Sequence, residues 1–234
     1  MYAFIVNFGA VNPISMKPIT IEAEIYAAAP SYAGCVVECS VLNSAHAPLL
    51  WEEIAAETHR LRSVYVVEEV NKLPGIYEMR QLYKKLGKDP NRYRPSAEAL
   101  CRRLLLGKEL YRINTLVDLI NLVSIRTGFS IGGFDAEKVQ GELSIGVGQA
   151  GESFEAIGRG QLNIEGLPVY RDALGAIGTP TSDVERSKLS LETSRLLMVV
   201  HSAGGASGLD EAVELALRLL TQYAQAHDFS LQRF

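Results

Sequence analysis

An amphipathic segment near the C-terminus constrains the fold of this 234-residue chain more than any other feature. Its apolar residues share helical spacing and form one stripe: Leu209, Val213, Ala216, Leu220 and Tyr223. Ser207 and Asp210 stand in an S-x-x-D arrangement, which indicates a capping box at the start of a helix. A helix with one apolar stripe must bury that face, so we expect it to cover a β-sheet as the last element of the chain.

Period-two alternation and short apolar runs predict the strands of this sheet. The predicted strands are residues 1–10, 19–25, 34–42, 64–70, 143–147, 167–170 and 195–201. The first run, MYAFIVNFGA, has no basic region ahead of it and therefore reads as a strand rather than a signal peptide. The many glycines between residues 132 and 178 indicate a meander of turns and short strands.

Helical spacing predicts helices over residues 48–61, 76–86, 96–106 and 115–126. Ser96 is the expected N-cap of the third, and Gly87 and Gly107 are expected to end the second and third. The two prolines within residues 88–95 predict a loop. No linker or internal repeat separates these elements, so we expect one compact unit that mixes helices and strands.

Composition excludes several classes of protein. A chain that is 47% hydrophobic and 21% charged is neither disordered nor fibrous. No run reaches the roughly 18–20 apolar residues of a membrane-spanning helix. Cys35 and Cys39 are four apart in a predicted strand and Cys101 is isolated, which predicts buried inert thiols in a cytosolic protein. We expect no metal site and no cofactor.

Positive charge is concentrated in one window. The net charge of the chain is −4, yet residues 80–112 hold ten cations and three carboxylates, so the window carries +7 and the remainder −11. Tyr83, Tyr93 and Tyr111 are interleaved with these cations. Such a composition is typical of a surface that meets phosphates and stacks on bases. The alternative is a pair of solvated helix faces whose cations pair with acidic groups elsewhere in the fold.

One glycine-containing motif, one histidine and one polar stripe are candidates for a functional site. Residues 146–151 match G-x-G-x-x-G, but no helix is predicted to open there, so a dinucleotide site is excluded. His201 closes a predicted buried strand and is interpreted as structural. Asn114, Asp118 and Asn121 stand at i, i+4 and i+7 on an otherwise apolar helix. They form either a buried capping network or a set of ligand contacts.

Three motifs carry a resemblance to a known family: Arg112-x-Asn114-x-x-Val117-Asp118-x-x-Asn121, then Phe134-Asp135, then Gly151-Glu152-Ser153-Phe154. They resemble the tRNA-binding and editing domain, called B3/B4, of the phenylalanyl-tRNA synthetase beta subunit. A fourth motif, Arg94-Pro95-Ser96-x-Glu98-x-Leu100-x-x-Arg103, resembles free-standing proteins that consist of that domain alone. The similarity is strongest over residues 71–202. It implies an α+β fold of the B3/B4 type, with a mixed β-sheet core flanked by helices, in a single domain over residues 1–234 with two intimately packed lobes.

The resemblance also implies a partner and a site. In the synthetase this domain hydrolyses tyrosine wrongly attached to phenylalanine tRNA, in a pocket between its two halves. The implied tRNA contacts are Lys84, Lys85, Arg92, Arg94, Arg102 and Arg103. Asn121 would orient the amino acid or water, and N–H groups at Gly132 and Gly133 would act as catalytic donors. The implied substrate contacts are Asn114, Asp118 and Phe134.

Two positions depart from the family pattern. Ile120 stands where the family has threonine, and Gly132 stands where it has histidine. The binding scaffold is therefore expected, while hydrolysis of mischarged aminoacyl-tRNA in trans stays open. The alternatives are a non-catalytic RNA- or amino-acid-binding module and a hydrolase of small amino-acid conjugates. The motifs of aminoacylation are absent, so a complete synthetase is not implied, and the oligomeric state is left open.

Overall fold

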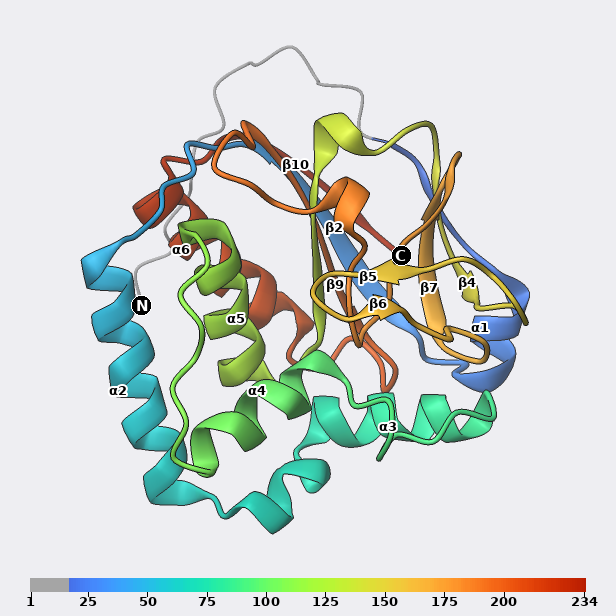
Figure 1. The fold of residues 1–234 in the computed structure, drawn as a ribbon, viewed down its shortest axis with the longest axis horizontal. Helices are drawn as coiled ribbons and strands as arrows, with labels where there is room; N and C mark the ends of the chain where they lie inside the picture. The colour runs from blue at the N-terminus through green and yellow to red at the C-terminus, as the bar shows by residue number, and fades with distance from the viewer. Residues whose placement is uncertain (1–16) are drawn as a thin grey trace.

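A four-stranded antiparallel sheet lies at the centre of the computed structural model, which describes residues 17–234 (Figure 1). Its strands, in spatial order, are β10 (His227–Arg233), β2 (Ala33–Ser40), β9 (Arg195–Ser202) and β3 (Ile131–Asp135). The two inner strands are buried along nearly their whole length, as expected for a sheet covered on both faces.

A second four-stranded sheet and a small hairpin lie on one side of this central sheet. The second sheet has the order β1 (Ile19–Ile21), β4 (Leu143–Val147), β7 (Pro168–Asp172) and β8 (Gly175–Gly178). Its β1–β4 pair is parallel and the other pairs are antiparallel, which makes it a mixed sheet. The hairpin is formed by β5 (Glu155–Ala156) and β6 (Gly160–Gln161).

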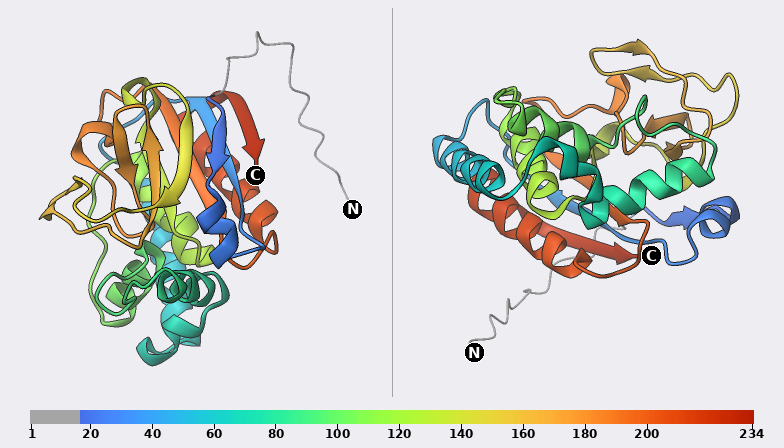
Figure 2. Two further views of the ribbon diagram at one scale, coloured as in Figure 1. Left: turned by 90° about the vertical axis from the view of Figure 1, so that its right-hand side faces the viewer. Right: turned by 90° about the horizontal axis from the view of Figure 1, so that it is seen from below.

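Helices cover the other side of the central sheet. The α-helices are α1 (Ala23–Ala28), α2 (Pro48–Val64), α3 (Pro74–Lys85), α4 (Ser96–Leu105), α5 (Thr115–Thr127) and α6 (Leu209–Ala224), and the 3₁₀ turns are η1 (Val67–Lys72), η2 (Ala136–Lys138) and η3 (Glu185–Ser187). In Figures 1 and 2, α2, α4, α5 and α6 gather on one side, α1 lies with the second sheet, and α3 runs along the lower edge of the first view. No helix within residues 17–234 combines the length and apolar character needed to cross a bilayer.

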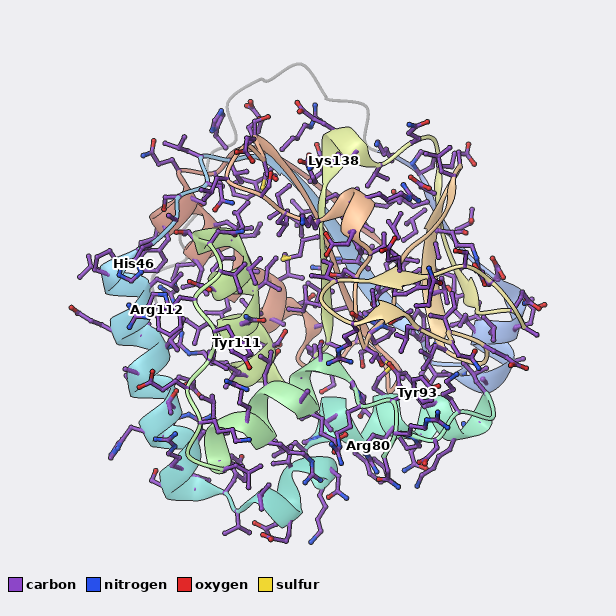
Figure 3. All side chains as sticks on the ribbon, viewed as in Figure 1. His46, Arg80, Tyr93, Tyr111, Arg112 and Lys138 are labelled. Carbon is purple, nitrogen blue, oxygen red and sulfur yellow. The ribbon has the colours of Figure 1, made fainter. Side chains whose placement is uncertain are left out.

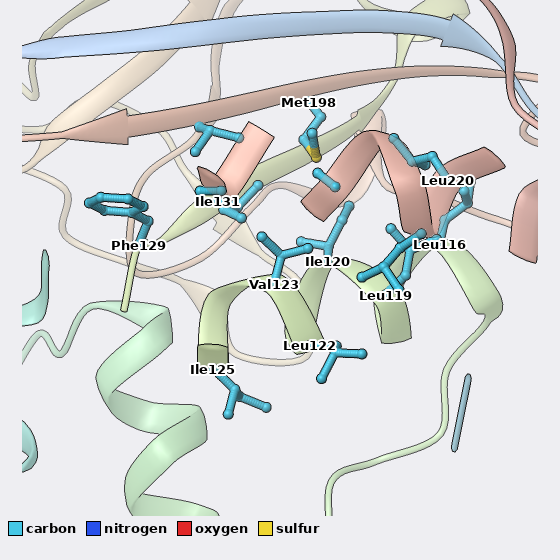
Figure 4. Close-up of a cluster of buried hydrophobic side chains, with 14 of the residues drawn as sticks. Leu116, Leu119, Ile120, Leu122, Val123, Ile125, Phe129, Ile131, Met198 and Leu220 are labelled. Atoms are coloured by element: carbon cyan, nitrogen blue, oxygen red, sulfur yellow. The ribbon is translucent and has the colours of Figure 1, made fainter. Parts of the chain in front are cut away.

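The central sheet separates two hydrophobic cores. Because side chains alternate along a strand, Val37 and Met198 face the helical core whereas Val36 and Val199 face the core shared with the second sheet. Figure 4 shows the helical core, where side chains of α5 point toward Met198 and Ile131. This arrangement confirms the α+β fold class, with two lobes that share one sheet.

Most predicted helices and inner strands are confirmed within a few residues, but one predicted strand is too long and another is wrong. The strand expected over residues 19–25 ends at Ile21, and α1 begins at Ala23. The run at 64–70 is not a strand: it comprises the end of α2 and the start of η1, and only its last residue, Val70, is buried. The predicted strand at residues 1–10 lies outside the described residues.

The predicted helix caps also differ from the structure. Ser96 is the first residue of α4 rather than its N-cap, which is Pro95. At α6 the N-cap is Gly208, with φ 74°, so the expected Ser207–Asp210 capping box does not form. The apolar stripe of α6 does cover the central sheet, as predicted. It is not the last element, because β10 follows it and pairs with β2.

Candidate nucleic-acid interface and the Gly133 region

A buried ion-pair cluster joins α3 to α4 inside the charged window. Glu98 on α4 is fully buried and accepts from Arg80 Nη1 at 2.8 Å and from Arg102 Nε at 2.7 Å. Arg80 also donates to the Pro90 carbonyl and to Asn91 Oδ1. Two guanidinium groups around one carboxylate satisfy charges that would be costly if left unpaired. The cluster therefore fixes the loop over residues 88–95 against both helices.

Lys88 is a second cation used within the fold. Its buried Nζ donates to the carbonyls of Asn163 and Glu165, at 2.8 and 2.7 Å, and lies 3.9 Å from the centre of the Tyr93 ring. Desolvation lowers the pKa of Lys88. Arg80 and Lys88 are thus not available to a partner, which the composition of the window did not reveal.

Apart from Arg102, which pairs with Glu98, the remaining cations of the window reach solvent. We call them the α3–α4 basic surface: Lys84, Lys85, Arg92, Arg94, Arg103, Lys108 and Arg112. None of the seven forms an ion pair with another residue in 17–234. Lys85 donates to the Ala28 carbonyl, and Arg103 donates to the Glu109 carbonyl. Of the six predicted tRNA contacts, only Arg102 has its charge balanced by a buried carboxylate.

The three tyrosines of the window have different environments. Tyr83 is fully buried and bonds Thr181 Oγ1 at 2.9 Å. Tyr93 is half-buried against Lys88, with the Arg92 guanidinium 5.6 Å from its ring centre. Tyr111 is exposed beside Arg103, as labelled in Figure 3. Only Tyr111 thus offers an open aromatic face.

Asn114 and Asp118 are both engaged by neighbouring protein groups. Asn114 caps α5, where its Oδ1 accepts from the Val117 N–H at 3.0 Å. Asp118 accepts from Trp51 Nε1 at 2.8 Å and from the Ile113 N–H at 3.2 Å. Burial raises the pKa of Asp118, and these two hydrogen bonds oppose the shift. The contacts match the capping-network alternative, since they hold the chain ahead of α5 against α2.

The space beside Gly133 is occupied by apolar side chains. A Cβ at Gly133 would lie 2.6 Å from Ile120 Cδ1 and 3.2 Å from Leu189 Cδ1. Figure 4 shows Ile120 pointing from α5 toward the central sheet. Asn121, the next residue on α5, is half-buried, and its side chain makes no hydrogen bond with any other residue in 17–234.

Gly132 and Phe134 face the opposite side of β3 from Gly133, because strand residues alternate. A Cβ at Gly132 would lie 2.9 Å from the Phe134 ring and 3.1 Å from Tyr170. Phe134 itself is fully buried in the core shared with the second sheet. The structure therefore places Ile120, rather than Asn121, against Gly133 on one face of the sheet, with Gly132 and Phe134 on the other.

Asp183 is a titratable residue of this region that the sequence did not indicate. Its carboxyl fits where a Cβ of Gly178 would otherwise stand, 2.4 Å from Asp183 Oδ1, and the nearby Gly133 backbone opposes the rise in its pKa. The residue keeps some solvent access, but surrounding protein raises the pKa of its carboxyl to about 8. Gly133 lies on β3, an edge strand of the central sheet.

His201 belongs to a buried aromatic network behind β3. Tyr32 Oη lies 2.7 Å from Nδ1 of His201, and Tyr170 Oη makes a short hydrogen bond with Nε2. Complete burial lowers the pKa of His201 to about 3, so the ring stays neutral. With both nitrogens occupied by tyrosines, the geometry agrees with the structural interpretation of this histidine.

The structure also tests the prediction that the three cysteines are buried, inert thiols. Cys35, Cys39 and Cys101 are free and buried, and Cys35 and Cys39 share one face of β2, as predicted. Burial raises the pKa of Cys39 and of Cys101 to about 12, which favours the unreactive thiol form. Within residues 17–234, no group of three or more His, Cys, Asp or Glu side chains is placed to hold a metal ion.

Comparison with known proteins gives a family match and a likeness to solved structures. No curated protein sequence matches the chain. Among solved structures, the N-terminal fragment of the phenylalanyl-tRNA synthetase beta subunit from Pyrococcus horikoshii is 12% identical, with a TM-score of 0.47. The alignment covers 92% of this chain and 50% of that fragment, so this chain spans half its length. The model of the B3/4 domain matches residues 78–225, which is more than half of the sequence, and the chain therefore belongs to the B3/4 domain family.

Proposed function

We propose that this protein binds tRNA through the α3–α4 basic surface. The observation that carries the proposal is that seven solvent-facing cations lie on two consecutive helices and the loops after them. They are opposed there by exposed Asp89 and Glu109 and by half-buried Glu78. A phosphate backbone gains affinity from such a surface by releasing its condensed counterions. The net negative charge of the rest of the chain directs RNA to this surface and away from the others.

The buried cluster around Glu98 supports the proposal by holding the surface in place. Arg80 bonds both Glu98 and the loop at Pro90 and Asn91, so Arg92 and Arg94 follow a segment with a fixed backbone. A preorganised loop loses little conformational entropy when it meets a ligand. tRNA is the proposed RNA because the B3/4 family includes the domain of the synthetase that this sequence resembles.

We favour binding without hydrolysis at Gly133. Ile120 and Leu189 fill the space next to this residue, which leaves no room there for a bound ester whose oxyanion its N–H could stabilise. The family histidine is absent at Gly132, where the Phe134 and Tyr170 rings leave no room for a side chain. A cytoplasmic location, where tRNA is charged, agrees with three free buried thiols.

The experiment is a retention and turnover assay with the purified full chain. The test variant carries Arg92→Gln and Arg94→Gln. The control carries Lys188→Gln and Arg233→Gln, which change the charge by the same amount. Lys188 lies in the loop between η3 and β9, and Arg233 lies on β10. We expect wild type and control to retain tRNA and the test variant to lose retention. Equal retention by all three would refute the proposed surface.

The same preparation is incubated with a panel of mischarged tRNAs to separate binding from editing. We expect the charged fraction to decay at the background rate, because apolar side chains pack against Gly133. Turnover of any member of the panel above background would contradict binding without hydrolysis and establish editing in trans.

A further inference from the structure

The segment between α4 and α5 is an irregular strap, residues 106–114, that is held at several points. Leu110 is buried in the helical core, and the Ile113 N–H donates to Asp118. Directly after the strap, the Thr115 N–H donates to the Ser44 carbonyl. Anchors at its middle and at its C-terminal end give the strap a defined backbone despite the absence of regular structure.

Three large apolar side chains of this anchored strap nevertheless point into solvent. The exposed fractions are 60% for Leu106, 68% for Tyr111 and 56% for Ile113. Tyr111 is the most exposed large hydrophobic side chain among residues 17–234. Packing gains nothing from this arrangement, and clustered exposed apolar side chains commonly mark a contact surface.

Two aromatic rings at this surface make cation–π contacts with arginine side chains. The Arg103 guanidinium lies 4.0 Å from the centre of the Tyr111 ring, and Arg112 lies 4.5 Å from the centre of the Trp51 ring. Trp51 is fixed in turn by its hydrogen bond to Asp118. A ring with a cation beside it and its remaining surface open is restricted in motion and can accept a flat partner.

We propose that the strap is a stacking surface for unpaired RNA bases, with Tyr111 as the aromatic platform and Arg103 and Arg112 as flanking cations. The inference rests on the proposed RNA binding and adds which part of the RNA meets which part of the protein. Unpaired bases expose π faces on which the Tyr111 ring can stack, whereas the faces of bases in a duplex are covered by neighbouring bases. Lys108 and Arg112 outnumber Glu109 on the strap, a balance that suits phosphates next to the stacked base.

The test compares variants of Tyr111 on the full chain with a short unpaired RNA oligomer and with an RNA duplex of the same sequence. Tyr111→Ala should weaken binding of the unpaired oligomer about 5- to 150-fold, the range for loss of one base–aromatic stack. Tyr111→Phe should keep wild-type affinity within about threefold, since the ring remains. Tyr77→Ala, at a half-exposed tyrosine on α3, is the matched control and should have no effect. The salt dependence should be the same in all four proteins, because none of these changes alters charge.

Trp51 provides an independent readout because it is the single tryptophan of the chain. RNA seated on the strap should change its fluorescence, and saturating oligomer without any change would overturn the location. Equal affinity of Tyr111→Ala and wild type for the unpaired oligomer would overturn the stacking role, as would an equal loss for duplex. Absence of any RNA binding by wild type would instead refute the proposed function, so the two failures are distinguishable.

Discussion

Removal of the Glu98 carboxylate should destabilise the whole lobe that carries the basic surface. In Glu98→Gln, Arg80 and Arg102 lose a carboxylate at 2.8 and 2.7 Å. Arg80 is itself buried, so most of its charge would stay away from water. Two hydrogen bonds to charged groups, at about 1.5–3 kcal/mol each, predict a loss near 3–6 kcal/mol. The usual cost of breaking a buried ion pair, about 3–5 kcal/mol, agrees with this sum.

Chemical denaturation measures this effect, with thermal denaturation as a second assay. For a chain of this size a loss of 3–5 kcal/mol corresponds to a fall in Tm of roughly 6–20 °C. Glu109→Gln is the matched control, because Glu109 is exposed and forms no ion pair within residues 17–234; it should change stability by less than about 0.5 kcal/mol. A change in Glu98→Gln as small as that of the control would refute the argument that the cluster holds α3 and α4 together.

Three further predictions concern the region around β3. Since the pKa of Asp183 is raised to about 8, its carboxyl keeps its proton in the folded state while the unfolded chain loses it near pH 3.9. Folding stability should therefore fall as pH rises from about 4 to 8, and Asp183→Asn should gain stability relative to wild type over that window; a pH-independent difference would contradict the shift. Burial lowers the pKa of His201 to about 3, so its ring nitrogens should give the neutral NMR signature at pH 5, and protonation near pH 6.5 would show that the ring is not buried. Gly133→Ala should cost about 1–3 kcal/mol in a denaturant titration because its Cβ would overlap Ile120, and Ile120→Val should recover part of that loss; no recovery would place the strain elsewhere.

Periodicity was sufficient for the parts of the fold in which a single pattern persists over many residues. The stripes of α2, α3, α5 and α6 and the buried run of β9 need no tertiary information. The run at residues 64–70 shows the limit, because four valines give a strand signal that the preceding helix and a 3₁₀ turn override. β10 was missed since its polar sequence, HDFSLQR, takes its strand form from pairing with β2.

The sequence was sufficient to locate the positive charge of the candidate site but not to show which of its side chains are buried or paired. Sequence identifies the +7 window, yet only the fold shows that Arg80 and Lys88 are buried and that Tyr111, rather than Tyr83, is exposed. Asp183 lies in a connection with no periodic signal, and its approach to Gly133 depends on how β8 and β3 meet across the shared core. The sequence placed Asn114 on the polar stripe of an apolar helix, and the structure makes it the N-cap of that helix.

tRNA affinity measured over a salt series decides whether this chain is an RNA-binding member of its family. We predict that the logarithm of the association constant falls linearly with the logarithm of salt concentration. The Arg92→Gln, Arg94→Gln variant should have a shallower slope, by about 0.7–0.9 for each phosphate that the variant no longer neutralises, whereas the Lys188→Gln, Arg233→Gln control keeps the wild-type slope. An affinity that does not change with salt, or an identical slope in all three proteins, would contradict RNA binding by the α3–α4 basic surface.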